Sequence, residues 1–321
     1  MNTAKPKKLK RILIVIFVLI LLAAVQLSWS NGYVAVEKFE YSDPDIPESF
    51  DEVKIAVVTD YHNHGGAYED RLVNKIKEQS PDYIFYVGDI IDSYFTDVNK
   101  AESLFRKCSE IAPGYLVYGN HELRVRKKEG GLEQYDRAAG KYGIRILNNE
   151  IADLEKNGEH RDLAGTTDTV GLFDISEAAK ELDKSAPLLW IHHYPEDFSV
   201  LAESAKKDGF EHALVFSGHA HGGLVQIPFT RTGIYAPGQG FLPEYTEGEY
   251  FYNDCEMILS RGCGNSSISL RTFDTFEVVL CELRLCKGDT DEKKYSLLKT
   301  IPYSARSFVL CLKIRDMKPP V

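Results

Sequence analysis

The sequence has few cysteines, and none of them is spaced to hold a structural metal ion. Its 321 residues include six cysteines, without a C-x-x-C pair and without the spacing of a zinc ribbon. A zinc-ribbon module is therefore excluded. We expect buried free thiols rather than disulfides, although export from the cytoplasm would permit disulfides. The six are Cys108, Cys255, Cys263, Cys281, Cys286 and Cys311.

The chain also lacks positive charge outside its first eleven residues. Five of its 38 lysines and arginines lie there, which leaves 33 against 48 acidic residues, a formal charge of about −15. Binding to a long nucleic acid needs a basic surface, so we expect no nucleic-acid partner. Small phosphorylated molecules remain candidate partners, because bound divalent cations reverse the sign of the local field.

Internal repeats and long disordered stretches are absent as well. Hydrophobic residues make up 44% of the chain and charged residues 27%, which is ordinary for a globular protein with a core. The length allows one large domain or two small ones.

Only one long hydrophobic run occurs, and it lies near the N-terminus. Five cations precede the 18 residues from Ile12 to Trp29, a length close to the minimum that spans a membrane as a helix. The positive-inside rule then predicts a single-pass anchor in the cell membrane, with the rest of the chain extracytoplasmic. Because Ser28 and Ser30 flank Trp29, a cleaved signal peptide is the alternative.

These features predict a division of the chain into five parts. We expect a basic cytoplasmic tail (1–11), an anchor or signal peptide (12–30), a linker (31–51), one catalytic domain (52–284) and a C-terminal extension of unassigned role (285–321).

From residue 52 onward, strand-like and helix-like segments alternate. Such alternation predicts a mainly parallel sheet covered by helices, with sites at the carboxyl ends of its strands. We expect strands at 53–59, 83–87, 115–118, 188–191 and 214–216, and helices at 68–79 and 98–111.

Short polar clusters follow these strands in a fixed order. Their carboxylate, imidazole and amide side chains are ligands for divalent ions such as Mn²⁺, Fe²⁺ or Zn²⁺, and a shared carboxylate can hold two such ions about 3.5–4 Å apart. Any one cluster alone is also explained as a turn or a flexible loop, but the ordered set is not. The clusters are T-D-Y-H at 59–62, G-D-I-I-D at 88–92, G-N-H-E at 119–122, H-Y-P at 193–195 and G-H-A-H at 218–221.

This ordered set resembles the calcineurin-like metallophosphoesterase superfamily, and more narrowly its membrane-anchored bacterial branch. The resemblance covers roughly residues 52–283 and includes the tail segments Leu259–Gly262 and Leu270-Arg271. It implies an α/β fold of two facing mixed β-sheets flanked by helices, a four-layer αββα sandwich. Glu122, where the motif often has Asp, is a small departure, and residues 285–321 have no place in the family pattern.

The resemblance also implies a role for each polar cluster. Asp89 would bridge two divalent ions, with Mn²⁺ the first choice and Fe²⁺ or Zn²⁺ the alternatives. His121 would be the general acid, oriented by Asp92, while a metal-bridging hydroxide attacks phosphorus in line. The other implied ligands are Asp60, His62 and His221 for the first ion and Asn120, His193 and His219 for the second.

Residues that bind the substrate are less marked in the sequence. Arg261 and Arg271 are candidates for gripping a phosphate oxygen, with pairing to carboxylates as the alternative. His64 is a candidate at the rim of the site. The aromatic and glycine-rich segment 227–252 is expected to form a lid or apolar lip, or to pack over the sheet edge.

The remaining histidines are expected outside the site. The side chain of His192 should point away from that of His193 and pack in the core or support a ligand. His160 and His212 are expected at the surface.

The sequence thus predicts a dinuclear metal-dependent phosphoric ester hydrolase. A phosphodiester or pyrophosphate is the expected substrate, and membrane tethering favours a lipid-linked or cell-wall phosphate. A phosphomonoesterase or nucleotide pyrophosphatase with the same site is one alternative. A non-catalytic, metal-stabilised binding module is the other.

Overall fold

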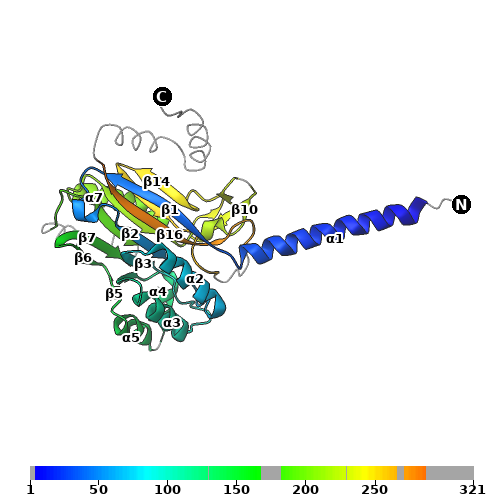
Figure 1. The fold of residues 1–321 in the computed structure, drawn as a ribbon, viewed down its shortest axis with the longest axis horizontal. Helices are drawn as coiled ribbons and strands as arrows, with labels where there is room; N and C mark the ends of the chain where they lie inside the picture. The colour runs from blue at the N-terminus through cyan, green and yellow to red at the C-terminus, as the bar shows by residue number, and fades with distance from the viewer. Residues whose placement is uncertain (1–3, 129, 168–181, 229, 266–270, 287–321) are drawn as a thin grey trace, which may run out of the picture.

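The computed structural model describes residues 4–128, 130–167, 182–228, 230–265 and 271–286. A long N-terminal helix, α1 (Ala4–Ser30), projects from a body made of two β-sheets and their covering helices (Figure 1). Of the predicted extension at 285–321, residues 287–321, and with them Cys311, lie outside the described residues.

The first sheet is mixed and has six strands. Its central strands run parallel, and β16 pairs antiparallel with β2. In spatial order the strands are β1 (Val34–Asp43), β16 (Phe276–Leu285), β2 (Lys54–Val58), β3 (Tyr83–Val87), β4 (Gly114–Val117) and β5 (Arg145–Ile146).

The second sheet is also mixed and has six strands. Its central strands β9, β8 and β7 run parallel, with an antiparallel pair at each edge. In spatial order the strands are β14 (Gly248–Tyr252), β15 (Cys255–Leu259), β9 (Ala213–Ser217), β8 (Leu188–His192), β7 (Glu159–Thr166) and β6 (Glu150–Lys156).

Alternating side chains on each strand build a four-layer core. On β2, Ile55 and Val57 pack between the two sheets, whereas Ala56 and Val58 face the helices that cover the first sheet. On the second sheet, Trp190 packs against the covering helix. The covering helices are α2 (Gly66–Gln79), α3 (Val98–Ser109) and α5 (Glu133–Lys141) on the first sheet and α7 (Phe198–Lys207) on the second. The predicted αββα sandwich is therefore confirmed.

Short elements occupy the loops between the strands. The helix α4 (Asn120–Arg126) follows β4 directly and carries a metal-ligand candidate as its first residue. Three 3-10 turns, η1 (Glu48–Phe50), η2 (Pro195–Asp197) and η3 (His221–Gly223), lie in other loops. Two small hairpins, β10 (Gln226–Ile227) with β11 (Thr232–Gly233) and β12 (Tyr235–Ala236) with β13 (Gly240–Phe241), fill the segment predicted as a lid.

The segment 31–51, expected as a linker, is instead part of the body. Its strand β1 pairs in parallel with β16 over ten residues, from Val34–Phe276 to Asp43–Leu285. Phe39 and Tyr41 of β1 are buried between the sheets. Four charged residues among ten hide this strand in the sequence, and β1 is an edge strand on which only Lys38 and Glu40 are exposed.

The N-terminal helix is long and apolar enough to cross a membrane. The candidate span runs from Lys8 to Ser30, and none of its most apolar 18-residue window is buried in the body. An apolar helix in this position is compatible with an anchor or with a signal sequence.

Candidate metal centre

The predicted ligands converge because five strands end at one rim. Asp60 follows β2, Asp89 follows β3 and Asn120 follows β4 in the first sheet. His193 and His219 follow β8 and β9 in the second. The carboxyl ends of parallel strands meet at one edge of a sheet, so side chains distant in sequence are brought within a few ångströms of one another.

The first cluster consists of Asp60, His62 and His221. The Nε2 atom of His221 lies 3.3 Å from Oδ1 of Asp60 and 3.4 Å from Nε2 of His62. The His62 and Asp60 atoms are 3.9 Å apart. Three buried ligand atoms thus surround one position.

The second cluster consists of Asp89, His193 and His219. The Oδ2 atom of Asp89 lies 3.3 Å from Nε2 of His193 and also 3.8 Å from Nε2 of His62 in the first cluster. One carboxylate oxygen therefore adjoins both clusters, which is the position a bridging ligand requires.

Asn120 completes the second cluster, and its side-chain amide has two possible orientations, in which the oxygen and nitrogen atoms exchange places. With nitrogen inward, the amide donates to Oδ2 of Asp89 at 3.3 Å and to Nδ1 of His219 at 2.9 Å. With oxygen inward, the same position brings three lone-pair-bearing atoms together without a donor between them. A bound cation favours the second arrangement, because it accepts electron pairs from all three atoms.

Hydrogen bonds behind the ligands hold them in place. The Nδ1 atom of His193 lies 2.8 Å from the carbonyl oxygen of Val87, so Nε2 points at Asp89. That Nε2 atom is buried without a hydrogen-bond partner among the described residues. The carboxylate of Asp60 accepts the backbone N–H of His219. Such outer hydrogen bonds are typical of metal ligands, and the donor set fits two divalent cations.

The charges of the ligands are strongly coupled. Burial favours a neutral Asp89, but His193, His62 and His121 hold the pKa of its carboxyl well below the ordinary value. Despite its burial, the pKa of His193 is raised to about 10, chiefly by Asp89. Burial and the nearby His193 lower the pKa of His219 to about 3. A cation held by Nε2 of His193 would require the ring to be unprotonated at that atom.

The backbone around the ligands is unusual. Left-handed φ angles occur at Asp60 (53°), His62 (47°), Asp89 (54°), His219 (69°) and His221 (51°). Non-glycine residues adopt this region rarely, at a cost on the order of 1 kcal/mol or more, and such strain gathers at functional sites.

Two glycines allow close approach at the centre of the site. Gly88 has a φ of 79°, and a Cβ there would lie 2.6 Å from Nδ1 of His193 in the second sheet. A Cβ on Gly119 would collide with Oδ1 of Asp89 in the neighbouring turn of the first sheet. Any side chain at either position would displace a ligand.

His121 lies beside both clusters, as predicted for the general acid, but its partner differs from the expected one. Its Nδ1 atom accepts the backbone N–H of Ser93 at 2.9 Å, which leaves the proton of the neutral ring on Nε2. Oδ2 of Asp92 is 3.6 Å from Nδ1 of His121 and 3.5 Å from Nδ1 of His62. Asp92 is thus placed to support His62 at least as well as His121.

Asp92 also fixes its own loop. Its Oδ1 atom accepts the backbone N–H groups of Tyr94 and Phe95 at 2.7 and 3.1 Å. Although burial opposes ionisation, these bonds and the His62 ring lower the pKa of Asp92 to about 2. Burial lowers the pKa of His121 to about 4.

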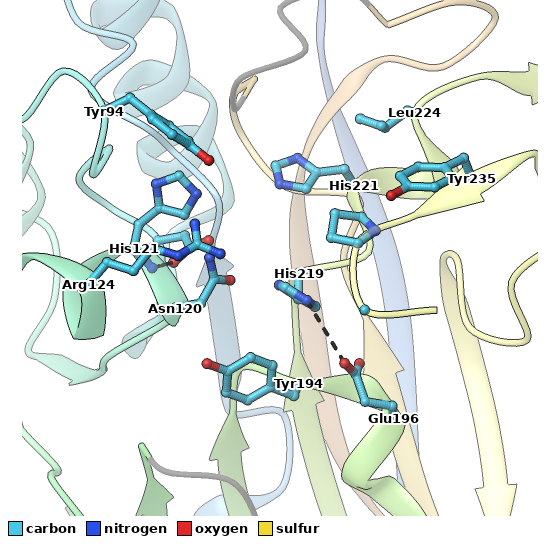
Figure 2. A pocket seen from close by; sticks show the side chains of 13 residues that line it. Tyr94, Asn120, His121, Arg124, Tyr194, Glu196, His219, His221, Leu224 and Tyr235 are labelled. Carbon is cyan, nitrogen blue, oxygen red and sulfur yellow. Dashed lines mark hydrogen bonds and ion pairs between the residues drawn. The ribbon is translucent and has the colours of Figure 1, made fainter. Parts of the chain in front are cut away.

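A cavity of about 420 Å³ opens beside the ligands (Figure 2). Part of its wall is the predicted lid segment, which contributes Tyr235, Pro237 and Gly238. The sequence reasoning missed five other wall residues, and of these only Arg124 had a usable signal, since it lies one helical turn after Asn120 on α4. The five missed residues are Tyr94, Arg124, Tyr194, Glu196 and Leu224.

The predicted phosphate-gripping role of Arg261 and Arg271 is not supported by their positions. Neither lines the cavity. Arg261 is buried and pairs with Glu277 at 2.6 Å and Glu247 at 2.9 Å. Arg271 is fully buried and pairs with Asp274 at 2.8 Å. Both guanidinium groups therefore neutralise buried carboxylates. This is the alternative role that the sequence suggested for them.

His64 does not line the cavity either. Its ring packs on Tyr68, with centroids 4.0 Å apart, and against Phe276 at 5.0 Å. Burial and the cations Lys100, Arg271 and Arg71 lower its pKa to about 4. The predicted contact with substrate therefore has no geometric support.

The remaining histidines lie outside the ligand clusters. His192 is buried, with Nδ1 2.7 Å from Thr166 and Nε2 3.0 Å from Asp197, in agreement with a supporting role. His160 is exposed beside Asp153. His212, expected at the surface, is half-buried beside Asp43.

The cysteines follow the expectation of free thiols. Within the described residues none forms a disulfide; Cys108, Cys255, Cys263 and Cys281 are buried, and Cys286 is half-buried.

Comparisons with known proteins agree with this geometry. The sequence profile of the calcineurin-like phosphoesterases matches residues 53–223, which include every predicted ligand. An uncharacterized metallophosphoesterase of Campylobacter jejuni is 28% identical over 85% of this chain and 68% of its own. One from Bacillus subtilis is 27% identical over 74% of this chain and 82% of its own.

More distant similarities extend to a vertebrate protein and to a solved structure. A transmembrane protein with a metallophosphoesterase domain from Danio rerio is 24% identical over 67% of this chain and 53% of its own. A dimetal phosphatase structure, also from Danio rerio, has 10% identity and a TM-score of 0.42 over 66% of this chain and 88% of its own. The family profile covers more than half of the chain and ends just past the G-H-A-H cluster, so this chain belongs to the calcineurin-like phosphoesterase family.

Proposed function

We propose that this protein is a membrane-anchored phosphodiesterase or pyrophosphatase that uses two divalent cations, with Mn²⁺ the first choice. The observation that carries the proposal is the position of Asp89, whose Oδ2 atom adjoins both buried clusters beside the cavity. A purely structural role would not need seven clustered ligand-type side chains, four of which line an open cavity.

The residues divide between the two cations as follows. Asp60, His62 and His221 would hold the first, and Asn120, His193 and His219 the second, with Asp89 common to both. When bound, two such cations supply a water-derived nucleophile and neutralise negative charge on the phosphoryl oxygens.

His121 is the proposed proton donor to the leaving group. Because Ser93 donates to its Nδ1 atom, the ring presents Nε2–H to the remaining surroundings, and the residue lines the cavity (Figure 2). A negatively charged phosphate beside the ring would raise its pKa again, since opposite charge favours the imidazolium form.

The wall of the cavity supports a diester over a monoester. Glu196 projects into it, with Oε1 3.9 Å from Nε2 of His219 (Figure 2). This carboxylate would repel the second negative charge of a monoester. Tyr94, Tyr194 and Tyr235 offer aromatic surface for the group on the other side of the phosphate.

The junction between α1 and the body supports a substrate at the membrane surface. Asn31, just after α1, accepts the backbone N–H of Arg271 at 2.9 Å and donates to its carbonyl oxygen at 3.0 Å. A guanidinium nitrogen of Arg271 lies 3.5 Å from Nδ1 of His221. Few residues thus separate the end of the helix from the metal cluster.

The predicted apolar lip supports the same location. On the second hairpin, Tyr235 and Pro237 line the cavity, while Phe241 and Leu242 are 80% and 74% exposed. Large apolar side chains exposed beside a site suit contact with lipid. We therefore propose an extracytoplasmic, single-pass arrangement and a lipid-linked or cell-wall phosphate as substrate.

A substrate panel tests the proposal. The full chain would be assayed with Mn²⁺ on a bis-aryl phosphodiester, an aryl phosphomonoester, a nucleoside diphosphate sugar and a lipid-linked pyrophosphate in vesicles. We expect turnover of the diester and the highest kcat/KM for the vesicle-bound pyrophosphate. Preference for the monoester would favour the phosphomonoesterase alternative, and bound metal without any turnover would favour a binding module.

A further inference from the structure

The guanidinium group of Arg124 lies in the cavity wall next to Asn120 and His121 (Figure 2). The side chain is exposed, and within the described residues it has no ion pair with a carboxylate. This is notable in a chain with a formal charge of −10, where other arginines near the site, such as Arg261, pair with several carboxylates.

Among the side chains that the structure describes, Arg124 finds an acceptor in the amide of Asn120, and only in one of the two orientations of that amide. With the Asn120 nitrogen directed toward Asp89 and His219, its oxygen accepts from Nη1 and Nη2 of Arg124 at 3.1 and 3.2 Å. In this orientation the amide forms hydrogen bonds with Asp89 and His219 through its nitrogen and with Arg124 through its oxygen. This is the arrangement expected without a cation.

If Asn120 held a cation in the second cluster, its oxygen would face inward as a ligand and its NH₂ group would face the guanidinium of Arg124. Two donor groups would lie about 3 Å apart with no acceptor between them. The guanidinium must find another acceptor, and its planar fork suits two oxygens of a phosphate.

We propose that Arg124 binds a phosphoryl oxygen of the substrate, and that loading of the second cation releases Arg124 for this task by reversing the Asn120 amide. Cation and anion binding are thereby coupled through one side chain. The inference rests on the proposed function and extends it by assigning a substrate-binding residue. An exposed arginine that only contacts solvent would show no such coupling.

The test measures binding of inorganic phosphate by calorimetry, to the full chain in detergent, with and without Mn²⁺. The variants are Arg124→Gln, Arg124→Lys and the control Arg126→Gln, which removes a charge from the same helix outside the cavity wall. Metal content is measured in parallel by mass spectrometry.

We expect the Mn²⁺-loaded wild type and Arg126→Gln to bind phosphate equally. Arg124→Gln should bind it about 10–100-fold more weakly at unchanged metal content, with Arg124→Lys between them. Without Mn²⁺ the three variants and the wild type should not differ. In turnover, Arg124→Gln should raise KM more than it lowers kcat.

Unchanged phosphate affinity in Arg124→Gln, or loss of metal from that variant, would overturn the proposal. Turnover with an unchanged KM in Arg124→Gln would overturn it and leave the proposed function standing. Phosphate binding that needs both Mn²⁺ and Arg124, in a protein that hydrolyses none of the panel, would support the coupling and contradict the proposed function.

Discussion

The carboxylate of Glu122 accepts a hydrogen bond from the backbone N–H of Asp89, with the two atoms 2.8 Å apart. It also accepts from the N–H groups of Ile91 and Gly119 at 3.0 and 2.9 Å. A buried side chain at the start of α4 thus joins the turn after β3 to the turn after β4, and each turn carries a metal-ligand candidate. Glutamate, rather than the aspartate frequent in this motif, reaches all three donors here.

Replacing Glu122 with Gln should weaken both the fold and the metal site. The amide has one acceptor oxygen instead of two and sets an NH₂ group against backbone donors, so we expect a loss of about 2–4 kcal/mol in the free energy of unfolding. Mn²⁺ affinity should fall as well, because the backbone of Asp89 is no longer held. Chemical denaturation and metal titration measure these effects; wild-type values for both would contradict this role.

Replacing His121 with Ala should leave two Mn²⁺ ions per chain and lower kcat by about 100–10,000-fold. The reason is that its Nδ1 accepts the backbone N–H of Ser93, so the neutral ring carries its proton on Nε2, and the residue lines the cavity. His160→Ala, at an exposed position, is the control and should behave as wild type. Loss of metal from His121→Ala would instead identify His121 as a ligand or a structural residue.

Arg261→Ala should destabilise the protein by about 3–5 kcal/mol, because it removes the cation paired with the buried carboxylate of Glu277 and one of the two cations paired with Glu247 and with Asp274. KM for a model diester should not change at a temperature where the variant is folded. Thermal unfolding and steady-state kinetics provide the two readouts. A raised KM at wild-type stability would restore the substrate-binding role predicted from sequence.

His64 should make the protein less stable as the pH falls. Its folded-state pKa of about 4 lies below the ordinary value of 6.5, so the unfolded state binds the proton more readily and stability is lost between about pH 6.5 and pH 4. From pH 7.5 to pH 5 the loss should be about 1–2 kcal/mol. Over the same pH range, the free energy of unfolding of His64→Phe should fall by about 1–2 kcal/mol less than that of the wild type. Both proteins would be compared by urea unfolding in the same detergent buffer with a chelator. An equal loss in both proteins would contradict this assignment.

The sequence predicted the parts of the fold that have strong periodicity. The strand at Tyr83–Val87 was located to the residue, and those near Asp60 and Asn120 to within one or two residues. All five strands predicted from the sequence are central strands of their sheets. They are buried on both faces and are therefore mainly apolar. Polar residues at their ends then predicted which side chains would meet.

Edge strands and long-range pairs could not be predicted in the same way. The strand β1 alternates charged and apolar residues and is recognisable only through its partner β16, more than 200 residues away. Arg261 is buried because it pairs with Glu247 and Glu277. Arg124 is exposed, and no carboxylate among the described residues pairs with it. Neither is a local property of the sequence.

The central claim is that Asp89 bridges two catalytic cations, and one paired measurement tests it most directly. The wild type and Asp89→Asn would be loaded with Mn²⁺, their metal content determined, and hydrolysis of a bis-aryl phosphodiester followed before and after chelation. We predict about two Mn²⁺ per wild-type chain, turnover that chelation abolishes, and fewer than two ions with no turnover in Asp89→Asn. Two ions and undiminished turnover in Asp89→Asn, or wild-type turnover that survives chelation, would contradict the account.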